Sequence, residues 1–239
     1  ATNVKKIQHP TGGVVGKIYV KNGDRVKAGD MLVRLDETVT KAGLQLITKQ
    51  IDELTGRQAR LRAERDDADD LNFPPELTAR RDEPAVAAIL SGEQSIFESR
   101  VGARKAQRDQ LGERIAGLNE EMAGLSSQSV AKQSEIDLIG SELASLEGLE
   151  SKQLVTTSKM NSLRREGARL KGELAQLKAA AGSAKQKIAE TEVQRISIDR
   201  EAKSDIGKDL RETEGRMVEL SERRVAAEDQ LKRIELKSP

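Results

Sequence analysis

The chain is poor in the residue types on which most enzymes and compact cores depend. Its 239 residues include no cysteine, no tryptophan, one tyrosine, two phenylalanines and a single histidine, His9. The absence of cysteine excludes disulfides, thiolate nucleophiles and cysteine-ligated zinc, and one histidine excludes a histidine-based triad or a multi-histidine metal centre. Three aromatic rings are too few for an ordinary globular core. We therefore expect neither an enzyme nor a protein that binds a cofactor or metal.

Long apolar stretches and an excess of one charge are missing as well. The chain contains no run of about 18 apolar residues, so we expect no bilayer-spanning helix in it. Its 41 lysines and arginines nearly balance 40 aspartates and glutamates, which gives a net charge of +1. The two signs are interspersed, so no basic surface for nucleic acid is expected. The abrupt start at Ala1, with no signal peptide, is what we expect of a piece of a longer protein.

A seven-residue repeat dominates the chain after residue 36. Charged residues make up 34% of the sequence, above the roughly 25% of an average globular protein. Apolar residues recur alternately every three and four positions, which is the pattern of a left-handed coiled coil. On the first predicted helix the positions of this repeat are Leu44, Ile47, Ile51, Leu54, Gln58, Leu61, Arg65 and Ala68.

Prolines divide the repeat into three predicted helices. Pro74 and Pro75 cannot continue a helix, whereas Pro84 suits the first turn of the next one. The expected order is a helix at 37–69, a loop at 70–84, a helix at 85–150, a tip at 151–156 and a helix at 157–236. The first two helices together exceed the third, so they cannot lie end to end and still return to the N-terminal module. We therefore predict a mainly α fold, with a long antiparallel coiled-coil hairpin and a three-helix lower part.

The hairpin is expected to reverse at Gln153. Residues at equal distances from Gln153 then face each other across the seam, and large residues meet small ones in several layers. Near the reversal the seam residues are predicted to be Ile139, Leu143, Leu146, Met160, Leu163 and Gly167.

Glycines interrupt both hairpin helices at many positions. Each costs up to about 1 kcal/mol relative to alanine in an exposed helix interior. One interpretation is that a long helical rod tolerates them, and the other is that they permit bending or close packing against neighbouring copies. The positions are Gly102, Gly112, Gly117, Gly124, Gly140, Gly148, Gly167, Gly172, Gly182, Gly207 and Gly215.

The first 36 residues follow a different pattern. Residues 9–36 alternate apolar and polar side chains and contain the turn signals Asn22-Gly23-Asp24 and Ala28-Gly29-Asp30, which predicts three or four short strands. Such a unit is too small to bury a core by itself. His9, before Pro10, is interpreted as a strand-edge residue.

This segment resembles the N-terminal half of a lipoyl- or biotinyl-type domain (a barrel-sandwich hybrid). In that family a lysine at the hairpin tip carries the cofactor, but Val39 stands at this position here and Lys41 lies two residues away. A carrier function is therefore not expected. The residues that carry the resemblance are Pro10, Gly13, Val14, Val15, Val20, Gly23, Asp24, Val26, Gly29, Leu32, Leu35 and Asp36.

The whole chain is similar to the periplasmic adaptor (membrane fusion) proteins of type I secretion systems, the HlyD-like family. The order of half a lipoyl domain, a long hairpin and a return to Ser238-Pro239 carries this resemblance. It implies that a second lipoyl half begins at 237–239, and that the membrane anchor and a β-barrel domain lie outside this chain. It also implies a periplasmic protein held at the inner membrane, and a ring-shaped homo-oligomer, by resemblance a hexamer.

The resemblance further implies that the tip docks on an outer-membrane channel. In the family, an arginine, a leucine four residues on and a serine or threonine seven further make this contact. Leu149 and Thr156 fill the second and third positions, but Ser145 stands where the arginine belongs, and Lys152 is a possible substitute charge. The residues predicted to dock are Ser145, Leu149, Lys152, Gln153, Leu154 and Thr156.

The function implied is an adaptor between an inner-membrane ABC transporter and an outer-membrane channel for type I protein secretion. One alternative is the adaptor of a small-molecule efflux pump of the resistance-nodulation-division type, although the extra helix argues against it. Another is a lipoyl or biotin carrier with a coiled-coil arm. Acidic pairs such as Asp66-Asp67 are interpreted as a solvated helix end, because an acid/base dyad needs a cleft.

Overall fold

The computed structural model describes residues 6–9, 12–150 and 156–238, with the backbone alone at Glu150. The chain divides into two compact units, which we call the sheet-bearing unit (Ala1–Val101 with Lys203–Pro239) and the hairpin unit (Gly102–Ala202). The elements are β1 (Val15–Ile18), β2 (Met31–Leu35), α1 (Thr38–Arg65), α2 (Pro75–Thr78), α3 (Pro84–Glu150), α4 (Thr157–Lys232) and β3 (Glu235–Lys237). Both long helices contribute to both units.

The three strands form one antiparallel sheet in the order β1-β2-β3. Gly23 and Gly29 adopt φ angles of 99° and 91° in the two turns between β1 and β2, a conformation that favours glycine. The described residues of 9–36 contain two strands, where three or four were expected. The third comes from the other end of the chain, because β2 has a second edge whose backbone groups need partners.

The C-terminal segment therefore differs from the prediction of a helix up to residue 236. Helix α4 ends at Lys232, and β3 pairs with β2 in a register that sets Met31 opposite Lys237. The backbone N–H of Ser238 donates to Asp30 and the N–H of Gly29 donates to Ser238, both at 2.8 Å. The repeat of apolar residues continues through Ile234, so it concealed this change from helix to strand.

The first helix and the loop after it also differ in detail. Helix α1 ends at Arg65 rather than at 69, and Asp67 has a positive φ of 50° that no α-helix accommodates. The segment expected to be a plain loop at 70–84 contains the single helical turn α2, with Pro75 at its start. Proline suits that position because its missing N–H would have no partner in a first turn.

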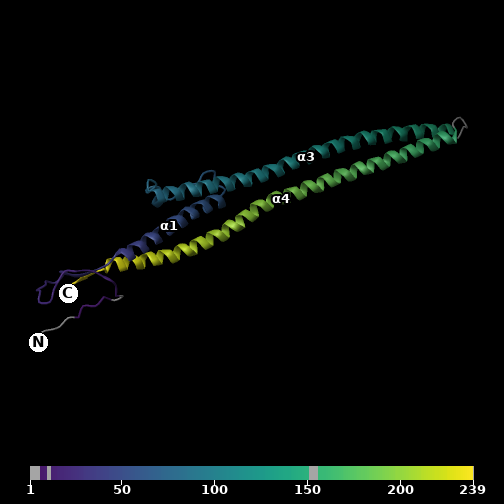
Figure 1. The fold of residues 1–239 in the computed structure, drawn as a ribbon. Coiled ribbons are helices and arrows are strands. Elements are labelled where there is room, and N and C mark those ends of the chain that lie inside the picture. Colours follow the sequence, from purple (N-terminus) through teal and green to yellow (C-terminus); the bar gives the residue numbers. More distant parts are fainter. Residues whose placement is uncertain (1–5, 10–11, 151–155, 239) are drawn as a thin grey trace. The chain divides into compact units, whose positions relative to one another are not determined.

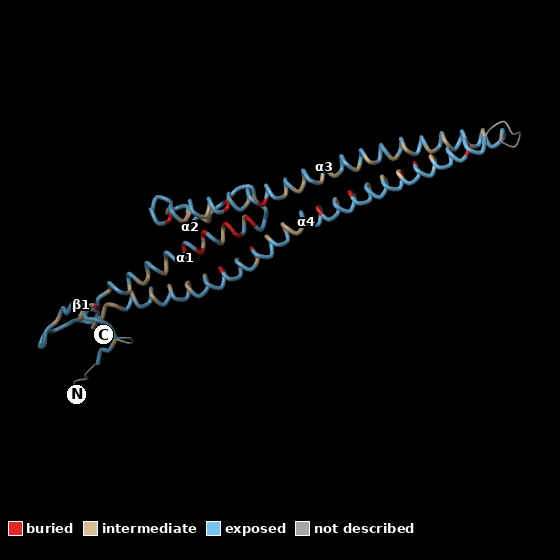
Figure 2. The backbone as a smooth tube through the Cα atoms, turned by 45° about the vertical axis from the view of Figure 1, so that its right-hand side comes forward, coloured by how far each residue is buried: buried red, intermediate tan, exposed pale blue. Residues whose placement is uncertain are grey.

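The sheet-bearing unit confirms the expected three-helix part. Helix α1 lies between the first part of α3 and the last part of α4 (Figures 1 and 2). On one side Leu61 forms a buried cluster with Ile206 and Leu210 of α4. On the other side Ile89 of α3 closes over Gly56. Helix α1 runs parallel to α3 and antiparallel to α4, as contacts at successive turns show.

The hairpin unit consists of α3 from Gly102 onward and α4 up to Ala202, packed as antiparallel partners. Its buried apolar residues come from α4 at heptad spacing, and the α3 positions that face them are half-buried. The mainly α fold with a long hairpin and a small sheet is thus confirmed. None of the helices in the described part of the chain is long and apolar enough to cross a membrane.

Candidate docking site at the end of the hairpin

Apolar packing holds the two helices together close to the reversal. Met160, in the first turn of α4, is completely buried. A Cβ atom placed on Gly167 would lie 3.4 Å from Cγ2 of Ile139, so a small residue of α4 meets a large one of α3, at equal distances from residue 153. Leu143, Leu146 and Leu163 are half-buried. All six residues predicted for the seam thus lie on the inner side of the hairpin.

Ion pairs flank this seam on both sides. Lys159 Nζ lies 3.9 Å from Glu142 and Arg164 Nη2 lies 3.5 Å from Glu147. Each pair joins α4 to α3, and all four side chains are about half-exposed. Such exposed pairs contribute little to stability, about 0.2–1 kcal/mol each. They connect α4 to α3 on both sides of the apolar seam.

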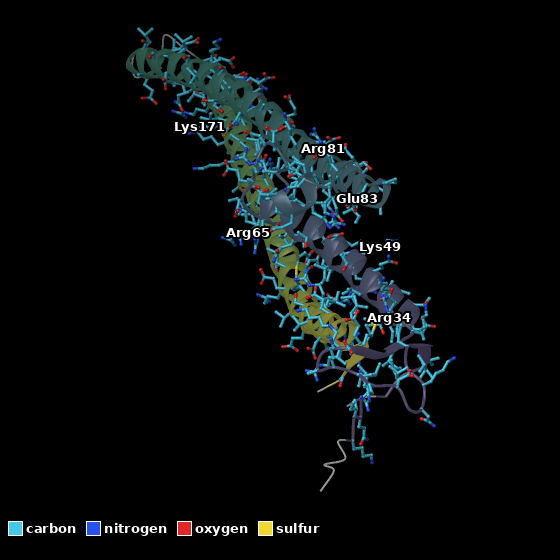
Figure 3. All side chains as sticks on the ribbon, turned by 90° about the vertical axis from the view of Figure 1, so that its left-hand side faces the viewer. Arg34, Lys49, Arg65, Arg81, Glu83 and Lys171 are labelled. Carbon is cyan, nitrogen blue, oxygen red and sulfur yellow. The ribbon has the colours of Figure 1, made fainter. Side chains whose placement is uncertain are left out.

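The two helices carry opposite charges near the reversal. Residues 135–150 of α3 include five acidic and no basic side chains, whereas residues 157–171 of α4 include five basic side chains and one acidic. Glu166 pairs with Arg169, whose guanidinium lowers the pKa of that carboxyl. Lys171, labelled in Figure 3, belongs to the basic set. The end of the hairpin therefore offers an acidic strip and a basic strip on neighbouring helices.

Three of the six residues predicted to dock are described, and all three are exposed. Ser145 donates a hydrogen bond from Oγ to the carbonyl of Ser141 at 3.0 Å. Leu149, one turn later on α3, keeps 38% of its surface exposed. The carbonyl of Thr156 accepts the N–H groups of Lys159 and Met160 at 3.1 and 3.4 Å, which starts α4. Lys152, Gln153 and Leu154 lie outside the described residues.

The sheet-bearing unit contains a buried polar cluster that the heptad analysis missed. Asp52, Gly56, Arg60 and Glu64 recur at every fourth residue of α1 and are all buried. They face α3 and the turn after α2, whereas the predicted heptad positions such as Leu61 face α4. The four-residue spacing was visible in the sequence. Buried arginine and glutamate, however, are hard to tell from a solvated helix face without the neighbouring helix.

No group of three or more histidine, aspartate or glutamate side chains in the described ranges is arranged to hold a metal ion. The ring of His9 lies 3.0 Å from the carbonyl oxygen of Arg233 through Nε2. Because a carbonyl only accepts, Nε2 carries the proton in this contact. His9 therefore ties the N-terminal segment to the end of α4.

Known proteins are similar to this chain in sequence. Residues 40–230 match the family model described as AprE, long alpha-helical hairpin. The chain is 38% identical to the type I secretion system membrane fusion protein PrsE of Rhizobium meliloti (strain 1021) over 99% of its own length. It is 35% identical to the proteases secretion protein PrtE of Dickeya chrysanthemi over 72% of its length.

A solved structure extends the comparison to three dimensions. The soluble domain of LipC, a membrane fusion protein of a type I secretion system, superposes with a TM-score of 0.92. The match covers 99% of this chain and 89% of that one at 24% identity, so it establishes a shared fold. The chain spans 54% of PrsE and 39% of PrtE, about half the length of these relatives or less. On the family model and the identity to PrsE together, the chain belongs to the AprE family of long α-helical hairpin proteins.

Proposed function

We propose that this chain is the hairpin-bearing part of a periplasmic adaptor for type I protein secretion. It links an inner-membrane ABC transporter to an outer-membrane channel, and the end of the hairpin docks on that channel. The exposed hairpin end in a chain 38% identical to PrsE carries this proposal. The adaptor resides in the periplasm and is anchored at the inner membrane by a segment outside this chain.

The composition of the hairpin unit supports a role in contact rather than in chemistry. Its buried residues form one narrow seam between two helices. Leu149 at the end of α3 presents an apolar group, and Thr156, just before α4, presents a hydroxyl group. A partner that receives such an end makes contact with both helices at once, which fixes its orientation. Ser145 adds no charge, so the acidic and basic strips supply the electrostatic part of the contact.

We also propose that copies of the chain pack side by side through the outer face of α3. A helix exposed to water is expected to carry charged residues on its outer face, but between residues 116 and 148 this face carries only Glu120 and Asp137. Val130 and Leu138 on the same face are 66% and 71% exposed. The residues of this face are Ala116, Gly117, Glu120, Ala123, Gly124, Ser127, Val130, Ala131, Ser134, Asp137, Leu138, Ser141, Ala144, Ser145 and Gly148.

Photo-cross-linking in intact cells tests both contacts. A photoreactive residue at Leu149 or Thr156 of the full-length protein should cross-link to an outer-membrane channel, and one at Leu138 should cross-link to a second copy. Val39, 82% exposed at the start of α1, is the matched control and should give neither product. Docking at the hairpin end is wrong if Leu149 and Thr156 yield no channel adduct while Leu138 still yields the dimer.

A further inference from the structure

Buried polar side chains connect α1 to its neighbour α3. Arg60 is 5% exposed and donates from Nε to Glu93 of α3 and from Nη1 to Glu64, both at 2.5 Å. Glu64, 3% exposed, also lies 3.6 Å from Arg100 of α3. Burial alone lowers the pKa of Arg60, but the hydrogen bonds to Glu93 and Glu64 outweigh it and raise that pKa. The buried arginine is therefore charged and is paired with two carboxylates.

Two further contacts lie on the same side of α1, one and two turns before Arg60. A Cβ atom on Gly56 would lie 2.9 Å from Cγ2 of Ile89, so only glycine lets the two helices approach this closely. Asp52 accepts a hydrogen bond from Nη1 of Arg80 at 3.1 Å, and its other carboxylate oxygen lies 3.0 Å from Nη2 of Arg80. Arg80 also pairs with Glu83, which is labelled in Figure 3. Four successive turns of α1 thus each meet a specific partner.

A displacement of α1 by one turn along α3 would break every one of these contacts. Arg60 would then face Ile89 or Phe97, which lie one turn before and after Glu93, and Phe97 is itself only 2% exposed. Ile89 would meet Asp52 or Arg60 instead of Gly56. Glu64 moves together with Arg60, so the charged partners on α3 that fix the position of α1 are Glu93 and Arg100. A buried charge without its partner is strongly disfavoured.

We propose that Asp52, Gly56, Arg60 and Glu64 form an alignment key that sets the axial position of α1 on α3. The apolar contacts of α1, such as Leu61 with Ile206 and Leu210, attach it to α4. The alignment key therefore specifies one arrangement of the three helices, whereas the apolar contacts between α1 and α4 supply most of the stabilisation. Replacement of a buried ionic network by apolar residues often leaves stability unchanged or raised, so the key and the stability can be separated by experiment.

The test uses the absence of cysteine in the chain. Spin labels at Lys49→Cys on the exposed side of α1 (Figure 3) and at Ser95→Cys on α3 report the alignment by their distance distribution. The unaltered helices should give one narrow distance. Arg60→Met combined with Glu64→Leu and Glu93→Leu should give a broadened or double distribution, because positions displaced by a turn of about 5.4 Å become accessible. A single, unchanged distance in this triple variant would overturn the proposal.

Two controls separate lost alignment from lost folding. The exposed pair Arg223–Glu219 on α4, 63% and 60% exposed, provides the matched variant Arg223→Met with Glu219→Leu, which should leave the distance unchanged. Labels at Lys49→Cys and Glu222→Cys, across α1 and α4, should keep their distance in the triple variant. If the triple variant does not fold, the exchange Arg60→Glu with Glu93→Arg decides. A single narrow distance between the labels on α1 and α3 in this exchange variant supports the alignment key, and a broad distribution contradicts it.

Discussion

Lys132 of α3 and Glu173 of α4 meet across the hairpin seam with 3.2 Å between Nζ and the carboxylate. Lys132 occupies a heptad position that normally holds an apolar residue, and it also binds Glu135 at 2.9 Å. The hydrogen bond to Glu135, followed by that to Glu173, raises the pKa of Lys132. A polar residue at one seam position selects one register at some cost in stability.

Lys132→Leu should therefore raise the unfolding midpoint of the chain by a few degrees. The leucine extends the apolar seam, and the released Glu135 and Glu173 remain partly solvated, at 51% and 35% exposure. Thermal unfolding followed by circular dichroism measures the change. Lys171→Leu, at an exposed position of α4, is the control and should not raise the midpoint. A lower midpoint for Lys132→Leu would mean that the ion pair contributes more than an apolar contact does.

Glycines of the hairpin should be replaceable by alanine with a gain in stability. A Cβ atom at Gly117 or Gly124 would meet no heavy atom within 4 Å. Alanine has the higher helix propensity, so each substitution should raise the free energy of unfolding by up to about 1 kcal/mol. Urea denaturation measures this gain. If these variants are more stable but no longer assemble, close packing of copies is the reason for the glycines. If the alanine variants still assemble, the helical rod simply tolerates these glycines.

Gly56→Ala should have the opposite effect. The added methyl group would lie 2.9 Å from Ile89 and 3.4 Å from Glu93, so α1 and α3 must move apart. Overpacking of this kind costs about 1–3 kcal/mol, which the same denaturation experiment detects. A gain in stability would show that the contact between α1 and α3 relaxes without cost.

Met160→Ala should destabilise the end of the hairpin. Met160 is completely buried, and truncation of a buried methionine to alanine costs about 2–5 kcal/mol. Hydrogen exchange of the first turns of α4 should accelerate, whereas amides of α1 should exchange as before. The exposed Leu149 is the control, because Leu149→Ala should leave exchange nearly unchanged. Equal protection in Met160→Ala and the parent protein would contradict the seam described near the reversal.

The junction between β2 and α1 should weaken in acid. The backbone N–H and the hydroxyl of Thr38 both donate to Asp36 Oδ1, at 2.9 and 2.7 Å. These hydrogen bonds, that of the backbone first, hold the pKa of Asp36 below its ordinary value of 3.8. A lowered carboxyl pKa contributes stability above pH 3.8, which is lost as the pH falls through the folded-state value.

NMR of the Thr38 amide measures this transition directly. Its chemical shift should titrate below pH 3.8 in the parent protein, and the first turn of α1 should exchange faster there. Asp36→Asn removes the charge and should abolish the titration. Asp24→Asn is a suitable control, since Asp24 makes a similar side-chain contact in a turn of the sheet, with the N–H of Lys21. Persistence of the titration in Asp36→Asn would assign it to another carboxyl group.

Local sequence features predicted most of the helical architecture. Pro74, Pro75 and Pro84 mark the interruption between α1 and α3, because proline removes a helical donor wherever it stands. The heptad repeat identified the inner side of the hairpin, since periodicity depends only on spacing along one helix. The resemblance to periplasmic adaptors singles out Leu149 and Thr156 at the predicted reversal, and their contact with a channel stays a prediction.

Long-range partners were beyond such an analysis. Residues Glu235–Lys237 form a strand because β2, some two hundred residues earlier, has backbone groups that need hydrogen-bond partners. The local sequence around residue 235 contains no sign of this distant partner. The residues of the alignment key on α1, from Asp52 to Glu64, have the composition of a solvent-exposed helix face. They are buried only because Glu93 and Arg80 lie against them in the folded chain. The sequence by itself determined where helices run and which side of each is apolar, because these depend on residue spacing. Tertiary structure alone decided which polar residues are buried and which ends of the chain pair, because each such choice depends on a distant partner.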